Sequence, residues 1–375
     1  MLPGKYGDRR KNFSLQSQDL KNIYSGKRVL ITGHTGFKGS WLGLWLHSLS
    51  AVVAGYSLDP PTTPSMFQIT QLADVIEDYR GDVRDYNLLK DVLNEFKPEI
   101  VFHLAAQPLV LQSYVEPRET FEVNVAGTVN VLDALRYTSS VKAIIVVTSD
   151  KCYENTESLY PYRETDALGG GDPYSASKAA AEIVCQSYRR SFFKKTGIGL
   201  ASARSGNVFG GGDWADNRLI PDAMRGINLR EPVTLRNPNS IRPWQHVLEP
   251  TYGYLLLGRY LSDQSIDYEH FAEAWNFGPN KESCLTTREL LDEFFDAYGE
   301  GSWQEDVSTG QATVSEATLL RLANDKAFQC LGWSPRWNMK KAVEKTVEWY
   351  KSFAAGDNMR QATLSNIKEY TEEFL

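Results

Sequence analysis

The chain has 375 residues, of which 42% are hydrophobic and 23% charged, and this composition excludes a disordered or fibrous protein. Its 40 Lys and Arg residues against 47 Asp and Glu residues give a net charge of −7, so no overall positive field favours nucleic acid or an anionic membrane. The longest apolar runs have the length of strands, and the polar N-terminus lacks the pattern of a secretory signal. The four cysteines form no C-x-x-C pair, so we expect reduced thiols and no metal site. We therefore expect a cytoplasmic protein without a nucleic-acid or membrane partner.

After an N-terminal extension of residues 1–26, short apolar runs alternate with longer helical patterns. This alternation predicts βαβ units and hence an α/β fold with a Rossmann-like doubly wound parallel sheet. The runs are continuously apolar, so we expect both faces of each strand to be buried. The expected strands are residues 28–32, 52–56, 75–79, 100–103, 142–148 and 198–203.

The alternation loosens from about residue 206 into loops rich in Gly, Asn, Pro and Trp, and helical periodicity returns at residues 287–298 and 340–353. A short run at residues 274–277 is expected to return to the first sheet, so that the two parts of the chain are interleaved. The expected division is a dinucleotide-binding domain over residues 27–205 and a smaller, mainly substrate-binding lobe over residues 206–375.

A glycine-rich turn follows the first expected strand and opens a helix expected over residues 40–49. Glycine permits the tight turn, lets a pyrophosphate approach the backbone and lets the helix pack close to the sheet, with the helix N-terminus facing the anion. The position in the first βαβ unit predicts dinucleotide binding, although the spacing is G-x-x-G-x-x-G rather than G-x-G-x-x-G. The candidate cofactor contacts in this turn are Gly33, Thr35, Gly36, Phe37, Lys38 and Gly39.

Acidic residues after the second and third expected strands predict how the adenosine end is held. Asp59 lies where a carboxylate accepts hydrogen bonds from the ribose hydroxyls. No Lys or Arg lies between Leu42 and Thr70, so a 2′-phosphate would meet a carboxylate and no cation, which favours NAD over NADP. Asp82 and Val83 are candidates for the adenine edge. Alternatively, Asp59 starts the turn that follows it and Asp82 caps the next helix.

Tyr174 and Lys178 stand four residues apart in a helix announced by Asp172-Pro173, so their side chains lie on one face. An ammonium beside a phenol favours the phenolate. We therefore expect Lys178 to lower the pKa of Tyr174 toward a value at which the phenolate takes a proton from a sugar hydroxyl. A solvated surface pair is the alternative for an isolated Y-x-x-x-K, but the glycine turn in the same chain favours the catalytic interpretation.

With these two motifs, the chain resembles the extended short-chain dehydrogenase/reductase family of nucleotide-sugar enzymes over nearly all of residues 27–337. Further matching motifs are His103-Leu104-Ala105-Ala106-Gln107, Asn124 in N-V-A-G-T and Arg242 in I-R-P-W. The resemblance implies NAD as the cofactor, with contacts from Leu104, Ala105 and Ala106. It also implies contacts to a nucleotide-sugar substrate, with loop packing as the alternative role, from Gln107, Asn124, Asn207, Arg218 and Arg242.

Ser149-Asp150-Lys151 at the end of the fifth expected strand distinguishes branches of this family. Epimerases usually lack an acid–base pair here, whereas sugar 4,6-dehydratases carry Asp-Glu or Asp-Lys. The resemblance therefore implies a lyase of the dehydratase branch, with CDP-glucose as the expected substrate. The chain departs from that branch at Ser149, where Thr is more usual, and at Val314-Ser315 before Glu316, where Pro-His is typical.

Removing the C6 hydroxyl of a sugar is difficult because the neighbouring C5 hydrogen is not acidic. Oxidation at C4 solves this problem, since a C4 ketone stabilises an enolate. We expect Tyr174 to take the C4 hydroxyl proton and Ser149 to donate a hydrogen bond to the ketone. Lys151, held neutral by burial or by the charge of Lys178, would take the C5 proton, and a protonated Asp150 would donate to the departing oxygen.

Two amphipathic patterns, residues 117–137 and 174–193, correspond to the helix pair through which this family commonly dimerises. The resemblance therefore implies a homodimer joined by a four-helix bundle, and helices that simply cover the sheet are the alternative. We expect His246 and Trp244 to pack rather than to take part in chemistry.

Two other functions stay open at this point. A nucleotide-sugar 4-epimerase of the same fold would need neither an acid at C6 nor a base at C5. A regulatory protein that senses NAD without catalysis would have little reason to retain Ser149, Tyr174 and Lys178 together.

Overall fold

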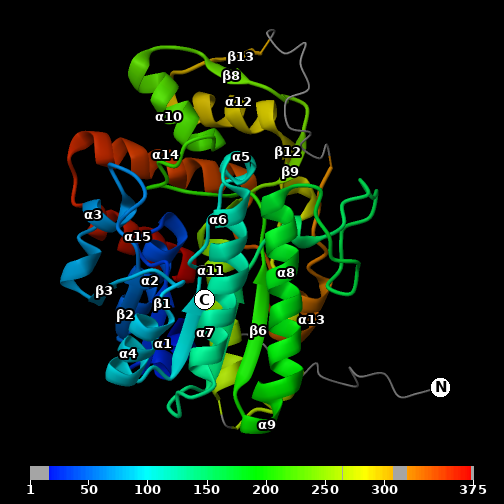
Figure 1. Cartoon of the computed structure of the whole chain (residues 1–375). Coiled ribbons are helices and arrows are strands. Elements are labelled where there is room, and N and C mark those ends of the chain that lie inside the picture. Colours follow the sequence, from blue (N-terminus) through cyan, green and yellow to red (C-terminus); the bar gives the residue numbers. More distant parts are fainter. Residues whose placement is uncertain (1–16, 264, 307–318, 373–375) are drawn as a thin grey trace.

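The computed structural model describes residues 17–263, 265–306 and 319–372 (Figure 1). Its centre is a sheet of seven parallel strands in the order β11-β6-β5-β4-β1-β2-β3. The doubly wound α/β fold expected from the sequence is therefore confirmed, and the run near residue 275 does join this sheet. The strands are β1 Arg28–Thr32, β2 Val52–Ser57, β3 Glu77–Arg80, β4 Ile100–His103, β5 Ala143–Val147, β6 Gly199–Arg204 and β11 Ala274–Asn276.

Strand order reverses between β1 and β4, which lie side by side with Thr32 opposite His103. From β1 the chain winds outward through β2 to β3, and it then crosses to β4 on the other side. The carboxyl ends of such strands leave a crevice at the point of reversal, where open α/β sheets bind ligands.

The third strand differs from its expectation. It was expected at residues 75–79 with both faces buried, whereas β3 is Glu77–Arg80 and three of its four residues are exposed. As the last strand in the order it has a single neighbour, so its polar side chains face solvent at low cost. The prediction of two buried faces is wrong for this strand.

Helices cover both faces of the sheet, and Figure 1 shows α7 and α8 in front of it. Around α2 and α11 a large apolar core forms on one face, and around α4, α7 and α8 a second core forms on the other. The helices that build these two layers are α1 Ser17–Tyr24, α2 Phe37–Ser48, α4 Tyr86–Phe96, α6 Pro117–Phe121, α7 Gly127–Leu135, α8 Pro173–Tyr188, α11 Leu248–Ser262 and α15 Met359–Glu372.

Two long helices expected from amphipathic patterns are each interrupted by a π-helical turn. The pattern over residues 117–137 divides into α6, the π turn Glu122–Ala126 and α7. The pattern over residues 174–193 divides into α8 and the π turn Arg189–Phe193. Neither pattern predicted its π turn, and π turns occur frequently at functional sites.

The later part of the chain forms a cap above the sheet, seen at the top of Figure 1. Here β8 pairs with β13 and β9 with β12, beside the predicted helix at residues 287–298, which is α12. The C-terminal α15 instead returns to pack on α2, where Arg360 donates to the carbonyl of Thr70. Segments beyond residue 206 thus contribute both to the cap and to the helices packed on the sheet. The division into two domains stays a prediction.

The remaining elements are short or lie mainly in the cap. The strands and helices are α3 Met66–Ile69, α5 Val110–Val115, α9 Lys194–Thr196, β7 Val208–Phe209, α10 Leu219–Leu229, β8 Val233–Leu235, β9 Ile241–Pro243, β10 Gln245–His246, β12 Cys284–Thr286, α12 Thr287–Tyr298, β13 Trp303–Glu305, α13 Asp325–Leu331 and α14 Met339–Ala355. The short 3₁₀ turns are Leu72–Asp74, Asp150–Cys152, Tyr268–His270 and Lys281–Ser283.

Packing accounts for His246 and for part of the N-terminal extension. His246 is buried among aromatic rings, with Trp337 at 4.8 Å between centroids. In α1, Tyr24 is fully buried and donates to the carbonyl of Leu255, so this segment belongs to the core. Within the described residues, no helix has the length and apolar character needed to cross a bilayer.

Candidate active site

One cavity of about 1140 Å³ opens where the strands end, between the sheet and the cap. This volume lies above the usual range for a single small ligand, about 300–1,000 Å³. Nearly all the residues predicted to act on cofactor or substrate line it. The exceptions are Gln107 and Asn124.

The glycine turn is as tight as its predicted role requires. A side chain at Gly33 would place its Cβ 2.7 Å from the amide nitrogen of Ala105, and one at Gly39 would place it 2.2 Å from the carbonyl oxygen of Gly33. Helix α2 begins at Phe37, three residues earlier than expected, and its N-cap Gly36 has no side chain to bond the first amides. These amides open on the cavity, so the turn fits the pyrophosphate of a dinucleotide.

At the adenosine end, Asp59 lines the cavity with an almost fully exposed side chain. The expectation that no cation lies near it is wrong. Arg80, at the end of β3, places Nη1 3.6 Å from Asp59 Oδ1 and Nη2 2.8 Å from Asp78 Oδ2. The sequence window around Asp59 missed this arginine because the cation comes from a neighbouring strand rather than from the same loop.

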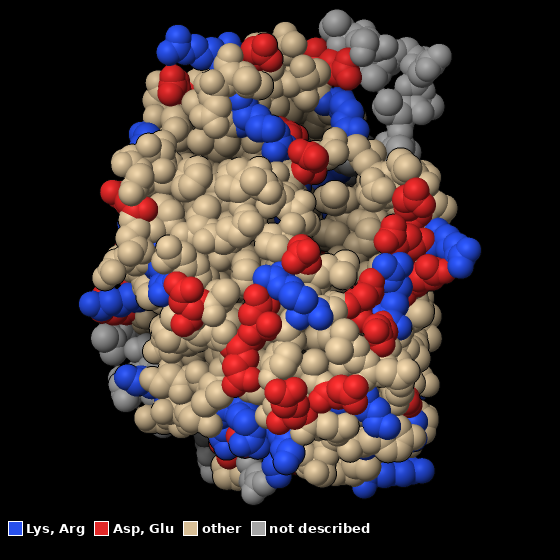
Figure 2. Space-filling model, turned by 60° about the vertical axis from the view of Figure 1, so that its left-hand side comes forward, with Lys and Arg blue, Asp and Glu red and all other residues tan. Residues whose placement is uncertain are grey.

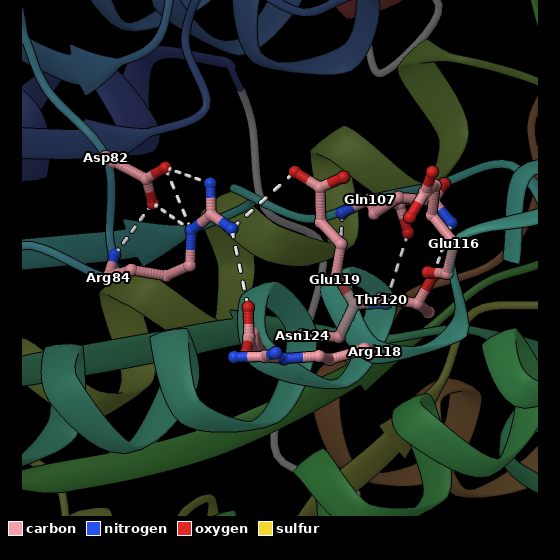
Figure 3. A network of polar contacts seen from close by, with 9 residues as sticks. Asp82, Arg84, Gln107, Glu116, Arg118, Glu119, Thr120 and Asn124 are labelled. Atoms are coloured by element: carbon pink, nitrogen blue, oxygen red, sulfur yellow. Dashed lines mark hydrogen bonds and ion pairs between the residues drawn. The ribbon is translucent and has the colours of Figure 1, made fainter.

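Asp82 also lines the cavity, and Figure 3 shows it held by Arg84. The Arg84 guanidinium donates to both carboxylate oxygens, at 2.6 Å to Oδ2 and 3.1 Å to Oδ1, and these bonds lower the pKa of Asp82. Arg84 also lies 3.6 Å from Glu119 of α6. Asp82 does not cap α4, because Asp85 does so by accepting from the Leu88 amide.

Gln107 and Asn124 brace the loop after β4 instead of facing the cavity (Figure 3). The Asn124 side chain accepts from the Gln107 amide at 2.8 Å and donates to Ser177 of α8 at 2.9 Å. The Gln107 side chain donates to Thr120. Their polar atoms are thus engaged within the protein, and their contact with substrate stays a prediction.

Helix α8 presents Tyr174 and Lys178 to the cavity. Asp172 caps the helix by accepting from the Ser175 amide at 2.9 Å, and Pro173 is its first residue, as expected. Lys178 Nζ lies 5.9 Å from the centroid of the Tyr174 ring.

The expected lowering of the Tyr174 pKa is not found. Burial raises the pKa of Tyr174 to about 12, although the nearby Ser149 side chain opposes the rise. Burial also lowers the pKa of Lys178 to about 8, which weakens the positive charge expected to hold the phenolate. Desolvation penalises both charged forms, and sequence spacing carries no information on this cost.

The 3₁₀ turn Asp150–Cys152 follows β5 closely, with Ser149 as its N-cap. The Ser149 hydroxyl accepts from the Lys151 amide at 3.2 Å and donates to Asp150 Oδ1 at 2.9 Å. Asp150 is fully buried, and its Oδ2 has no hydrogen-bond partner among the described residues. Lys151 Nζ lies 3.8 Å from Asp150 Oδ1. A Cβ at Gly206 would lie 2.0 Å from Oδ2, so only glycine leaves room for this carboxyl.

Beneath this turn lies a buried charge pair that the sequence did not reveal. Glu182 of α8 accepts from Arg204 of β6 at 2.8 Å and from the hydroxyl of Thr148, the residue before Ser149, at 2.5 Å. Arg204 also donates to Tyr153 at 2.7 Å. The pair ties the catalytic turn to β6 and α8. From its position in the sequence, one helical turn after Lys178, Glu182 looks like an ordinary surface residue that forms an ion pair with this lysine.

Lys38 has a place that the glycine motif alone did not predict. Its Nζ donates to Ser205 at 3.2 Å and to Tyr254 at 3.4 Å, on the side of the cavity that holds Asp150. Burial, assisted by the positive charges of Arg218 and Lys178, lowers the pKa of Lys38 to about 7.

The cap contributes the predicted cations Arg218 and Arg242, which line the cavity with Asn207. Arg218 donates to Asp213 at 2.9 Å, and Asn207 has a buried Oδ1 without a hydrogen-bond partner among the described residues. Sequence reasoning missed Arg236, which lines the same part of the cavity. The departure noted at Val314-Ser315 and Glu316 lies outside the described residues.

Similarity to known proteins shows the family to which this chain belongs. The fold, with a glycine turn that opens on a crevice at the ends of parallel strands, is that of a dinucleotide-binding protein. The profile of the GDP-mannose 4,6 dehydratase family matches residues 30–346. The chain belongs to this family of 4,6-dehydratases.

Individual relatives support this membership. The CDP-glucose 4,6-dehydratase of Salmonella typhimurium is 47% identical over 93% of this chain and 98% of its own length. The dTDP-glucose 4,6-dehydratase 1 of Escherichia coli is 26% identical over 87% of this chain and 93% of its own. The dTDP-glucose 4,6-dehydratase of Streptomyces venezuelae, crystallised with NAD bound, has the same fold, with a TM-score of 0.74 at 22% identity over 89% of this chain and 99% of that one.

Proposed function

We propose that this chain is a CDP-glucose 4,6-dehydratase, which uses NAD to convert CDP-D-glucose into CDP-4-keto-6-deoxy-D-glucose and water. The observation that carries the proposal is the placement of Asp150 and Lys151 in the same cavity as Tyr174 and Lys178. An epimerase has no use for an acid–base pair beside its tyrosine. The identity to the Salmonella dehydratase over almost the whole chain supports the choice of substrate.

The glycine turn and Lys178 would hold NAD, which would supply the hydride acceptor at C4 and the hydride donor at C6. Tyr174 removes the C4 hydroxyl proton, and Ser149 donates a hydrogen bond to the ketone oxygen. Lys151 then removes the C5 proton, while Asp150 donates a proton from its unpartnered Oδ2 to the departing C6 oxygen. The departing group leaves as water.

The cap would hold the diphosphate of the substrate. Arg218 and Arg242 supply guanidinium groups, which match phosphate oxygens in charge and geometry. Figure 2 shows acidic and basic side chains interspersed over the face that it presents. Such a mixture of charges favours a small anionic substrate over a nucleic acid as the partner, and a cytoplasmic location is part of the same proposal.

We also propose that the protein is a homodimer joined through α6, α7 and α8. Phe121 of α6 and Ile183 of α8 are 40% and 56% exposed, and α6 packs beside α8. Val115, just before α6, is 70% exposed. A second copy of the same helices would bury these apolar side chains in a four-helix bundle.

The substrate assay tests the proposed activity directly. Purified protein with NAD is incubated in turn with CDP-, dTDP-, UDP- and GDP-glucose, and the alkaline absorbance of 4-keto-6-deoxy products is followed. We expect conversion of CDP-glucose alone. Formation of a nucleotide-linked galactose without the keto product would replace the proposal by an epimerase, and conversion of another nucleotide sugar would reject the assigned base.

A further inference from the structure

Arg84 binds the carboxylate that is predicted to meet the adenine of NAD, so the inference drawn from it rests on the proposed function and its cofactor. The Arg84 amide donates to Asp82 Oδ1 at 2.8 Å, and Nη2 of its guanidinium donates to Oδ2 at 2.6 Å. The Nε–H group is shared between the two oxygens, at 3.1 and 3.0 Å. A carboxylate has about four acceptor directions, so these three N–H groups leave room for about one further donor. Asp82 lines the cavity, from which that donor would come.

The backbone of this loop is fixed by neighbouring elements. The Asp82 carbonyl accepts from the Tyr56 hydroxyl of β2 at 2.8 Å. Asn130 of α7 donates to the carbonyls of Val83 and Arg84, at 3.0 and 3.1 Å. Because the main chain is held on both sides, the direction of the Asp82 carboxylate depends on its own side-chain torsions and on Arg84.

Acidic side chains of α6 and of the π turn after it hold the other side of the guanidinium. Arg84 Nη1 lies 3.6 Å from Glu119 Oε1 and 3.8 Å from Glu122 Oε2. Figure 3 shows the guanidinium between Asp82 and Glu119. The planar fork of arginine contacts two acceptor groups at once, which the point charge of lysine does not. Hydrogen bonds from Arg84 also lower the pKa of Asp82, so the carboxylate stays an anion at neutral pH.

We propose that Arg84 is the positioning residue that makes the cofactor site select adenine, because it fixes one acceptor direction of Asp82 toward the cavity. Adenine carries an amino group at C6, which donates a hydrogen bond to such an acceptor. Hypoxanthine carries a carbonyl oxygen at C6 instead, so that two acceptors face each other and the contact is lost. The N1–H donor of hypoxanthine points elsewhere along the ring edge, and a fixed carboxylate does not follow it.

Without Arg84, the Asp82 carboxylate would turn freely, since the χ2 torsion of aspartate is broad and roughly two-fold. A free carboxylate accepts either from the amino group of adenine or from the N1–H of hypoxanthine, so the selectivity falls. An arginine that only stabilised the loop would instead change the affinity for both dinucleotides by the same factor. The ratio of the two affinities therefore separates a positioning role from a structural one.

Replacing Arg84 by Met removes the guanidinium and keeps a long side chain. Calorimetry without substrate gives the dissociation constants of NAD and of nicotinamide hypoxanthine dinucleotide. We expect the wild-type protein to bind NAD about 10- to 100-fold more tightly, the range of one specific base contact, and Arg84→Met to reduce this ratio to less than about 3-fold. Arg84→Lys keeps the charge without the fork and should reduce the ratio in the same direction.

The matched control is Arg118→Met. Arg118 belongs to the same network, but its guanidinium donates to Glu122 at 2.6 Å rather than to Asp82. Its side chain is 90% exposed, so its loss should leave the fold intact. The ratio of the two dissociation constants should stay at the wild-type value in this variant. Thermal unfolding of each protein shows that it is folded, and Arg84→Lys decides the matter if Arg84→Met does not fold.

A wild-type ratio near one, or a ratio that is unchanged or raised in the folded Arg84 variants, would overturn the positioning role while leaving the dehydratase intact. Wild-type protein that binds neither dinucleotide would instead reject the proposed function, and the role of Arg84 with it. Because no substrate is present, a protein that binds NAD but leaves CDP-glucose unchanged would reject the activity alone, and the ratio would still decide the role of Arg84.

Discussion

Replacing Glu182 by Gln measures how strongly the buried charge pair holds the catalytic turn. The side chains of Glu182 and Arg204 are 2% and 3% exposed, and their closest N–O distance is 2.8 Å. Glutamine keeps the volume but removes the negative charge, which leaves the guanidinium buried without a counter-charge. Breaking one partner of such a pair costs about 3–5 kcal/mol. A domain of ordinary stability has only about 5–15 kcal/mol in total, so the loss should be large.

Urea unfolding followed by tryptophan fluorescence measures this loss. The matched control is Glu372→Gln, because Glu372 and its partner Lys368 are 56% and 75% exposed at 3.6 Å, and an exposed pair contributes only about 0–1 kcal/mol. If Glu182→Gln lowers the free energy of unfolding by less than about 1 kcal/mol, and by no more than the control does, the stabilising role of the Glu182–Arg204 pair is refuted.

The pair should also make stability depend on pH. Burial alone would raise the pKa of Glu182, but Arg204 and three hydrogen bonds to the carboxylate lower it overall. A carboxylate with a lowered pKa stabilises the folded state above its unfolded pKa, and this contribution is lost as the pH falls through the folded value. Wild-type protein should therefore lose stability on acidification more steeply than Glu182→Gln. Parallel acid profiles for the two proteins would contradict this assignment.

Three further changes test other parts of the site and surface. Asp150→Asn combined with Lys151→Met should lower formation of the keto-deoxy product by at least about 100-fold. Reduced nicotinamide should still form when substrate is added, and its absorbance measures this. Unchanged product formation would remove the acid–base assignment. Gly39→Ala should abolish NAD binding in calorimetry, because its Cβ would lie 2.2 Å from a carbonyl oxygen, and wild-type affinity would contradict the assigned turn. Ile183→Glu should convert the dimer to monomers in sedimentation analysis, and an unchanged mass would place the interface elsewhere.

Part of the site could be located from the sequence because it depends on residues that are close together in the chain. The turn after β1 needs glycine wherever its backbone approaches another backbone, and Gly33 and Gly39 do so in the structure. Tyr174 and Lys178 share a face because the helical repeat places them there. Ser149, Asp150 and Lys151 reach the crevice because they directly follow a buried parallel strand.

Corrections arose where a residue's environment comes from distant segments. Arg80 approaches Asp59 from a neighbouring strand, so a search of the loop around Asp59 could not find the cation. The pKa of Tyr174 is raised rather than lowered, because the cost of burial outweighs a favourable spacing to Lys178. Asp82 is engaged by Arg84 instead of capping a helix, and the capping role belongs to Asp85.

Local pattern by itself predicted the parallel sheet and the glycine turn, since periodicity and spacing are properties of neighbouring residues. The acid–base roles of Asp150 and Lys151 came from the resemblance to a family and stay a prediction. Tertiary structure alone decided which charges are desolvated and which side chains meet: the Glu182–Arg204 pair, the position of Lys38, and the burial of Tyr174. The physical reason is that electrostatic and hydrogen-bond energies depend on distance and burial in space, and a linear order of residues specifies neither.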